Sequence, residues 1–375
     1  MSKFLKIQCA CLFASVFAFS TIVQAETITD VAGRTVEIPN KVDRVLLGEG
    51  RMLYSMAILD KDNPTKRIVG WQGELKSSDV NGYNAYLKKF PTIKDIPLIG
   101  QTSEASVNPE TVMALQPDIA IFGIAGHGPG VTNPLVEKLQ SAGVPVVFID
   151  FRQYPMKNTI PSIKILGKVL HREEAANKYL AFYEKHLNRI QERVAKIPAN
   201  ERTTVFIEML PEVKSPTCCH TAGKGNFGEF IEAAGGHNIA ADILPAVIGE
   251  ISLEHVISVD PKVYIMSGTA TNDAKLGLKA GQGVTQQNAA QSLKRLTTRT
   301  GVNALTAVAS IDNTHGIWHN FYNSPYNIIA IEAFAKWFYP DLFKDVDVQE
   351  TFNELQEFLP VDIQGTYWVD LRDAS

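Results

Sequence analysis

The stretch VNPETVMALQPDIAIF, residues 107–122, has a near-copy later in the chain, ISLEHVISVDPKVYIM, residues 251–266. Aligned without a gap, the two segments share identical residues at four positions: Glu110/Glu254, Val112/Val256, Pro117/Pro261 and Ile121/Ile265. Each segment has the pattern of a short helix that ends at a proline and leads into an apolar strand. A helix-and-strand unit that occurs twice predicts two lobes of the same α/β type.

The order of the predicted elements supports this division. Short apolar strands alternate with amphipathic helices up to about residue 150, and the alternation restarts at residue 203. Between them, residues 171–198 keep apolar side chains at helical spacing and end at Pro198. A chain of 375 residues also exceeds what a single core usually organises. We therefore predict two doubly wound α/β lobes, residues 26–170 and 199–375, joined by one long helix over residues 171–198.

The first 25 residues have the features of a secretory signal peptide. Two lysines precede an apolar run, and small residues surround the expected cleavage point after Ala25. A membrane anchor is the alternative, but the run is shorter than the roughly 20 residues that a span requires. Neither Cys9 nor Cys11 follows the pattern of a lipid-modified N-terminus. We expect a soluble, exported chain that begins at Glu26.

Composition excludes some classes of function. Hydrophobic residues make up 45% of the chain and charged residues 20%, with a formal net charge of −4. This composition is ordinary for a globular protein and offers no general attraction for nucleic acid. No nucleophile elbow, phosphate-binding loop, zinc-protease motif or dinucleotide fingerprint occurs between a strand and a helix. These observations favour a binding protein, and an exported enzyme that uses a cleft between the lobes stays the alternative.

Basic and aromatic residues are concentrated in segments that follow predicted strands. In a doubly wound lobe the carboxyl ends of the strands form the ligand edge, and two such edges facing each other would form a cleft. Rings supply apolar area, and arginine supplies a planar fork of donors for carboxylate or catecholate oxygens. The candidate ligand-binding residues are Arg51, Trp71, Arg152, His220, Trp318 and Tyr322. A place in the core is the competing interpretation for a ring such as Trp71, whereas Arg51 needs an anionic partner.

Two further loops contain residues that could carry chemistry. SPTCCHTAGKGNF, residues 215–227, places two cysteines and a histidine in a row. Ligands of a single metal ion are usually separated by two to four residues, so this spacing disfavours a metal site. Cys218 and Cys219 are expected to form a vicinal disulfide or to remain buried thiols. GHGPG, residues 126–130, lacks the spacing of a phosphate loop and is interpreted as a flexible rim.

Nearly all of the chain after residue 25 resembles the periplasmic substrate-binding proteins of ABC importers for ferric siderophores, haem and cobalamin. DVAGRTVEIP followed by RVLLGE is similar to their start, and NPETVMALQPDIAIF to their first lobe. FGEFIEAAGGHNIA with ISLEHVISVDPKVYIM is similar to their second lobe, and SPYNIIAIEAFAKWFYPDLF to their closing segment. The resemblance implies two α/β lobes joined by one long helix, a ligand cleft between them, and a monomer in the periplasm.

The resemblance also implies the partners. Glu110 and Glu254 fall where such proteins place one glutamate on each lobe to dock into arginine pockets of the inner-membrane permease. A helix-dipole contact in the first turn is the structural alternative for each. A ferric siderophore encloses its own metal, so we expect no protein metal ligand and no cofactor. Haem ranks second and cobalamin third. Haem would need an axial histidine or tyrosine, and four histidines could serve: His127, His220, His315, His319.

Overall fold

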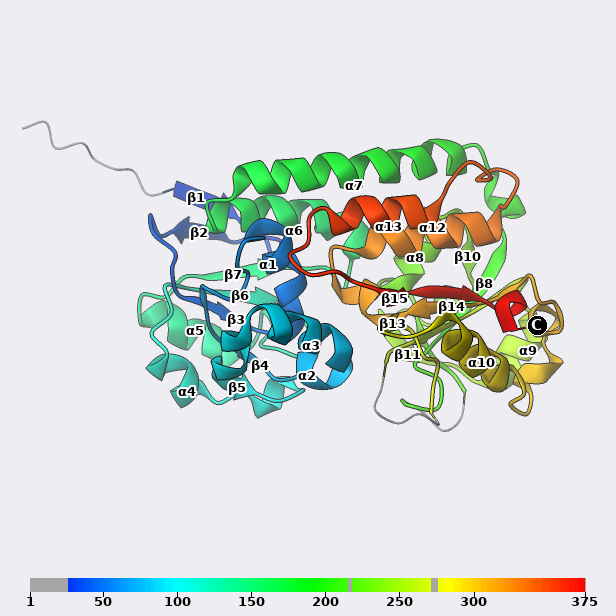
Figure 1. Cartoon of the computed structure of the whole chain (residues 1–375), viewed down its shortest axis with the longest axis horizontal. Coiled ribbons are helices and arrows are strands. Elements are labelled where there is room, and N and C mark those ends of the chain that lie inside the picture. Colours follow the sequence, from blue (N-terminus) through cyan, green and yellow to red (C-terminus); the bar gives the residue numbers. More distant parts are fainter. Residues whose placement is uncertain (1–25, 215–217, 271–275, 375) are drawn as a thin grey trace, which may run out of the picture.

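The structure is a computed structural model that describes residues 26–214, 218–270 and 276–374. The predicted signal peptide, residues 1–25, therefore lies outside the described residues. Two lobes lie side by side, and helix α7 (Glu173–Val194) extends along both of them (Figure 1). None of the helices in these described ranges has the length and apolar character needed to cross a bilayer.

The N-terminal lobe is built on a sheet of five parallel strands. Their spatial order is β5 (Leu98–Gly100), β4 (Ile68–Gln72), β3 (Val45–Leu47), β6 (Ile119–Gly123) and β7 (Val146–Ile149). A hairpin of β1 (Glu26–Thr29) and β2 (Thr35–Ile38) precedes the sheet. The helices of this lobe are α1 (Leu53–Leu59), α2 (Leu75–Ser78), α3 (Val80–Lys89), α4 (Pro109–Ala114), α5 (Pro134–Ser141) and α6 (Pro155–Val169).

The C-terminal lobe has a second five-stranded sheet, parallel except for its last edge strand. The order is β10 (His237–Asn238), β8 (Thr204–Met209), β12 (Val263–Gly268), β14 (Thr314–Trp318) and antiparallel β16 (Trp368–Asp370). Two small pairs flank it: β9 (His220–Ala222) with β11 (Ile248–Glu250), and β13 (Gly281–Gln282) with β15 (Gly365–Thr366). Its helices are α8 (Phe227–Ala233), α9 (Leu253–Val259), α10 (Gln286–Thr297), α11 (Thr306–Ala309), α12 (Asn327–Phe338) and α13 (Val348–Gln356).

The repeated sequence forms the same unit in each lobe. Asn108 caps α4 and Ser252 caps α9 through their side-chain oxygens. Each helix is followed by a residue with a left-handed backbone, Gln116 at φ 45° and Asp260 at φ 46°, and then by a proline that cannot continue the helix. The strands that follow, β6 and β12, each pair with the first sheet strand of their lobe, β3 and β8. The predicted two-lobed α/β fold is confirmed.

Helix α7 is amphipathic and packs against both lobes. Its buried face includes Tyr179, Tyr183 and Ile190, and it contacts α1 of the N-terminal lobe and α12 of the C-terminal lobe. His186 lies in the same face, where its two ring nitrogens are 2.9 Å from Glu332 and 3.0 Å from Glu354. Apolar burial and these polar contacts together tie the helix to the C-terminal lobe.

An aromatic seam joins the lobes directly. The ring of Tyr54, from α1, lies 5.8 Å from Trp318 and 5.5 Å from Tyr326, both in the other lobe. Trp318 in turn packs edge-on against Tyr367, at 5.1 Å. Asp79, at the start of α3, accepts a hydrogen bond from the Tyr54 hydroxyl at 2.8 Å. Ring packing of this kind holds the lobes together on one side of their boundary.

Candidate functional site

The strand order identifies where the ligand edge of the N-terminal lobe lies. β3 is the first strand of the sheet, with β4 on one side and β6 on the other, so the switch point lies between β3 and β6. Glu49 and Arg51 follow β3, the loop of residues 124–130 follows β6, and Arg152 follows β7. From the other lobe, residues 319–323 follow β14 and meet this edge.

Arg51 reaches across the boundary, and both of its terminal nitrogens contact polar groups of the protein, whereas its buried Nε has no hydrogen-bond acceptor among the described residues. Its side chain is 3% exposed. One terminal nitrogen donates to the Tyr322 hydroxyl at 2.6 Å and lies 3.4 Å from the Asn320 Oδ1. The other lies 3.4 Å from the Glu49 carboxylate, and Nε lies 3.8 Å from Glu74. The anionic partner that the sequence required for Arg51 is thus supplied by two carboxylates of its own lobe.

Arg152 is the less satisfied of the two arginines. Its guanidinium lies 5.4 Å from the centre of the Tyr322 ring, and that of Arg51 lies 5.3 Å from it. Among the described residues, Nε and Nη1 of Arg152 are buried and have no hydrogen-bond acceptor. A buried guanidinium with unused donors favours an anionic group in front of it.

Glu49 connects three parts of this site. Its carboxylate accepts hydrogen bonds from the amides of His127 at 3.0 Å and Gly128 at 3.4 Å, and from the Asn323 side chain at 2.9 Å. Burial by itself would raise the pKa of Glu49, but the charges of Arg51 and Arg152 and the hydrogen bond from the His127 amide lower it to about 2. The loop interpreted as a rim does border the boundary, and two of its amides are occupied by Glu49.

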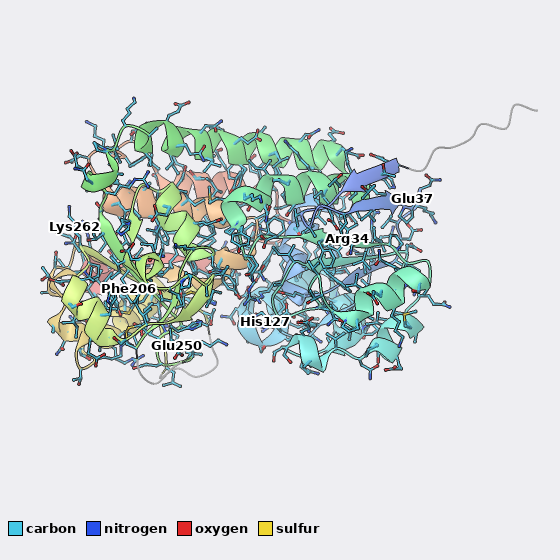
Figure 2. All side chains as sticks on the ribbon, turned by 180° about the vertical axis from the view of Figure 1, so that it is seen from behind. Arg34, Glu37, His127, Phe206, Glu250 and Lys262 are labelled. Carbon is cyan, nitrogen blue, oxygen red and sulfur yellow. A yellow bond between two sulfur atoms is a disulfide. The ribbon has the colours of Figure 1, made fainter. Side chains whose placement is uncertain are left out.

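Three histidines lie near these cations, and their pKa values are lowered first by burial and then by neighbouring positive charges. His127 is half-buried, with Nδ1 2.9 Å from the Thr102 carbonyl, and burial together with Arg51 and Arg152 lowers its pKa to about 4. Burial and Lys214 lower the pKa of His220. Burial and then Arg51 hold the pKa of His319 well below its usual range. Each of these shifts favours the neutral imidazole, and Figure 2 labels His127 where the two lobes approach each other.

The fourth histidine and the two tryptophans lie elsewhere. His315 is buried near the beginning of β14 and stacks on Trp337 at 4.2 Å. Trp71 is 0% exposed within β4. Trp318 is buried in the aromatic seam. The structure brings Arg51, Arg152 and Tyr322 into direct proximity with His220 nearby, but it does not bring Trp71 or Trp318 into that group.

The space between these side chains is small. Glu49, Arg51, Arg152 and Asn323 border an internal cavity of about 20 Å³. This volume suffices for roughly one water molecule, whereas pockets for small organic ligands measure about 300–1,000 Å³. In the arrangement seen here, the space bordered by these side chains is thus too small to hold a ligand of chelate size.

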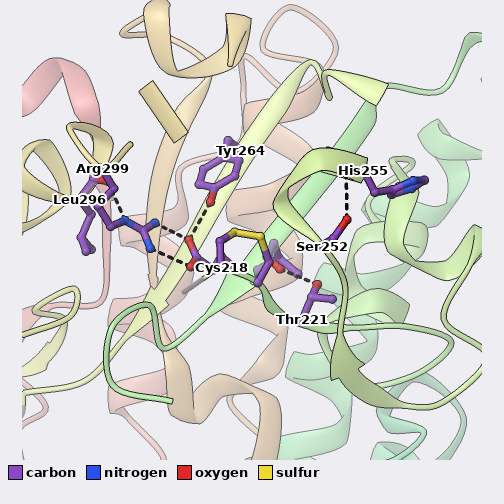
Figure 3. Close-up of a disulfide and its surroundings, with 10 residues drawn as sticks. Cys218, Thr221, Ser252, His255, Tyr264, Leu296 and Arg299 are labelled. Atoms are coloured by element: carbon purple, nitrogen blue, oxygen red, sulfur yellow. Dashed lines mark hydrogen bonds and ion pairs between the residues drawn. A yellow bond between two sulfur atoms is a disulfide. The ribbon is translucent and has the colours of Figure 1, made fainter. Parts of the chain in front are cut away.

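Cys218 and Cys219 form a vicinal disulfide just before β9, next to His220 (Figure 3). The backbone of Cys219 exchanges two hydrogen bonds with Ile251, at 3.2 and 3.1 Å. Of the two alternatives that the sequence left open, the structure shows the disulfide. Within the described ranges, no group of three or more His, Cys, Asp or Glu side chains is arranged to hold a metal ion.

Glu110 and Glu254 occupy matching positions on the surface. Each lies in the first turn of its helix, α4 or α9, and each is exposed. Glu110 lies 3.4 Å from Lys138, and its pKa is lowered by a backbone hydrogen bond and by that lysine. No ion pair with Glu254 is present in the described part of the chain. The two carboxylates are thus exposed at corresponding places on the two lobes, that of Glu110 beside Lys138.

Sequence reasoning missed Glu49, Asn320 and Asn323. Glu49 stands two positions before Arg51, directly after an apolar strand, and a carboxylate there was a signal of the same kind as the arginine. The asparagines gave no comparable signal, because they approach Arg51 and Glu49 from more than 260 residues away in the chain.

Comparison with known proteins gives consistent matches. A family model described as periplasmic binding protein matches residues 64–310. An uncharacterised ABC transporter substrate-binding lipoprotein of Bacillus subtilis is 24% identical over 332 residues, 85% of this chain and 87% of that protein. A cobalamin-binding protein of Halobacterium salinarum is 28% identical over 212 residues, 56% of this chain and 53% of that protein.

Solved structures agree on the fold. The crystal structure of the TroA-like periplasmic binding protein FepB from Veillonella parvula matches with a TM-score of 0.80 and 25% identity, covering 92% of this chain and 99% of that one. A molybdate-binding protein of Haemophilus influenzae matches with a TM-score of 0.68 and 19% identity, covering 90% of this chain and 100% of that one.

Proposed function

The chain belongs to the periplasmic binding protein family, and from this membership we propose that it captures a ferric siderophore and delivers it to the permease of an ABC importer. The protein binds and releases its ligand and catalyses no reaction on it. A siderophore surrounds ferric iron with its own oxygens, so the receptor needs to recognise an anionic surface and supplies no metal ligand.

The observation that carries this proposal is the pair of unused donors on Arg152. They lie beside the ring of Tyr322 and close to a second arginine, at the carboxyl edge of a doubly wound sheet. Neutral His127, His220 and His319 add hydrogen-bonding groups without adding charge that would need a counter-ion. Such a set suits catecholate, hydroxamate or carboxylate oxygens that carry net negative charge.

The test is a titration of the purified protein with ferric siderophores of different chemistry, followed by tryptophan fluorescence. Arg152→Ala should weaken the best chelate by about 1.5–3 kcal/mol, because a hydrogen bond to a charged group is lost. Arg202→Ala is the matched control, since Arg202 pairs with Glu232 at 3.1 Å and lies outside the site. Failure of every ferric chelate to bind, with turnover of some other small molecule, would refute the proposal and favour an enzyme.

Haem is the second candidate, and the state of His127 favours it. A half-buried imidazole whose pKa is lowered to about 4 stays neutral at pH 7, which is the form that coordinates iron. Haem bound through this residue would give a Soret band that His127→Ala shifts or abolishes. A Soret band with unchanged position in that variant would exclude His127 as the ligand. Cobalamin, bound by the Halobacterium relative according to its name, stays the third candidate.

Glu110 and Glu254 are proposed to dock onto the permease. A bidentate arginine contact to one carboxylate on each lobe would fix the orientation of the receptor at two points. Replacing both by alanine should abolish uptake in cells and leave the affinity for the chelate unchanged. Normal uptake by the double variant, or an equal loss of chelate affinity, would contradict the docking role.

A further inference from the structure

We propose that Glu49 is the positioning residue of the interlobe site, holding Arg51, the loop of residues 126–128 and Asn323 of the opposite lobe in one arrangement. Each carboxylate oxygen has a separate set of partners. Oε1 accepts from the amides of His127 and Gly128, within the N-terminal lobe. Oε2 accepts from Asn323 at 2.9 Å, across the boundary, and lies 3.4 Å from Arg51.

The loop is shaped to fit this carboxylate. A Cβ atom on Gly126 would lie 2.4 Å from Glu49 Oε1, and one on Gly128 would lie 2.3 Å from the Gly48 carbonyl oxygen. The same Cβ on Gly126 would lie 3.4 Å from Arg152 Nη1. Gly126 therefore lies close to both the Glu49 carboxylate and the Arg152 guanidinium. Movement of the Glu49 carboxylate would displace the loop of residues 126–128, and this loop packs against Arg152.

The opposite hypothesis makes Glu49 a simple counter-charge for Arg51. In that case the carboxylate would compete with an anionic ligand, and its neutralisation would strengthen binding. The two hypotheses predict opposite signs for Glu49→Gln, which keeps the shape of the side chain and removes its charge. The network favours positioning, because three of the four contacts of Glu49 are to neutral donors that no counter-charge role requires.

Glu74 provides a matched control. It is the second buried carboxylate beside Arg51, 3.8 Å from Nε, and it accepts from the Arg51 amide at 2.9 Å. Within the part of the chain that the structure describes, its carboxylate forms no hydrogen bond to residues 126–128 or to Asn323. Glu74→Gln therefore alters the second carboxyl group beside Arg51, whose pKa is raised by burial to about 7, without breaking the network that defines the proposal.

The experiment measures two quantities on the full-length mature chain. Affinity for an anionic ferric tris-catecholate chelate rests on the proposed function; hydrogen exchange of peptides covering residues 124–130 and 319–323 does not. Glu49→Gln should weaken the chelate at least tenfold and speed exchange in both peptides, whereas Glu74→Gln should leave exchange in both unchanged. Tighter or unchanged chelate binding by Glu49→Gln, or unchanged exchange in either peptide, would overturn the proposal.

A second variant keeps the proposal testable should Glu49→Gln fail to fold. Asn323→Ala removes only the contact across the boundary and leaves the two loop amides on Glu49. It should speed exchange in residues 319–323 and leave residues 124–130 protected. Loss of protection in both peptides, or in neither, would contradict the separate roles of the two oxygens. If no ferric chelate binds the wild type, the proposed function fails while the exchange results still decide the role of Glu49.

Discussion

Two carboxylates of the N-terminal lobe are buried at the same boundary, each 3% exposed, and their surroundings drive their pKa values in opposite directions. Burial raises the pKa of Asp79 to about 6, because its partners are the Tyr54 hydroxyl, one amide and a wall of rings. Burial also acts on Glu49, but Arg51 and Arg152 outweigh it and lower that pKa to about 2. Two carboxylates that are equally buried can therefore have pKa values that are shifted in opposite directions.

The difference divides the boundary into two halves. Around Glu49 the two arginines keep that carboxylate ionised at physiological pH, while burial raises the pKa of the neighbouring Glu74 to about 7. Around Asp79 the contact between the lobes is apolar, and burial disfavours the ionised form of that carboxyl group. The polar half can exchange its contacts for those of a ligand, whereas the aromatic half holds the lobes in register.

The largest effect is expected for Glu49→Gln. Because the folded pKa, about 2, lies below the ordinary value of 4.5, Glu49 stabilises the fold above pH 4.5 and loses that contribution as the pH falls toward 2. The free energy of unfolding of the variant should be about 3 kcal/mol lower than that of the wild type at pH 7. This difference should become smaller as the pH falls. Urea unfolding of the wild type and of Glu49→Gln between pH 3 and 7 measures this difference. If the free energies of unfolding of the two proteins changed with pH in parallel, the lowered pKa of Glu49 would be refuted.

Asp79→Asn should have a slightly smaller effect of the opposite sign. The folded pKa, about 6, lies above the ordinary value of 3.8, so the stability contributed by the protonated group is present below pH 3.8 and is lost as the pH rises through 6. The wild type should lose about 2–3 kcal/mol relative to the variant over that window. The same unfolding series checks this. A variant that follows the wild type at every pH would refute the raised pKa.

The smallest effect is expected from removing one hydroxyl on either side. Tyr322→Phe removes the acceptor of an Arg51 donor, and Tyr54→Phe removes the donor to Asp79, each at a cost of about 1–2 kcal/mol. Only Tyr54→Phe should also move the stability loss of Asp79 to higher pH, because its hydrogen bond lowers that pKa. A similar shift in Tyr322→Phe would show that the two halves are electrostatically coupled.

The fold was largely predictable because its decisive signals are local. In each lobe a capped helix is followed by a left-handed residue and a proline. The repeat that contains Glu110 and Glu254 therefore predicts the same helix-and-strand unit in both lobes. The site was only partly predictable. Loop position placed Arg51, Arg152 and Tyr322 in one group, and the structure brings these three side chains together. Whether a ring points inward depends on neighbours far away in the chain.

Trp71 and Glu49 illustrate what sequence could not decide. Trp71 lies at the carboxyl end of a strand, as a ligand-binding ring would, and is nevertheless enclosed in the core. Glu49 gains its importance from Asn323, which is 274 residues distant. Neither periodicity nor spacing reports a contact over that separation.

Helix α7 has a mechanical consequence for the whole molecule. Its 22 residues span about 33 Å and contact α1 at the N-terminal lobe and α12 at the other. The helix therefore couples the two lobes, and a rotation at one end is transmitted to the other over this length. A partner that contacts both Glu110 and Glu254 would respond to a change in the distance between these two points.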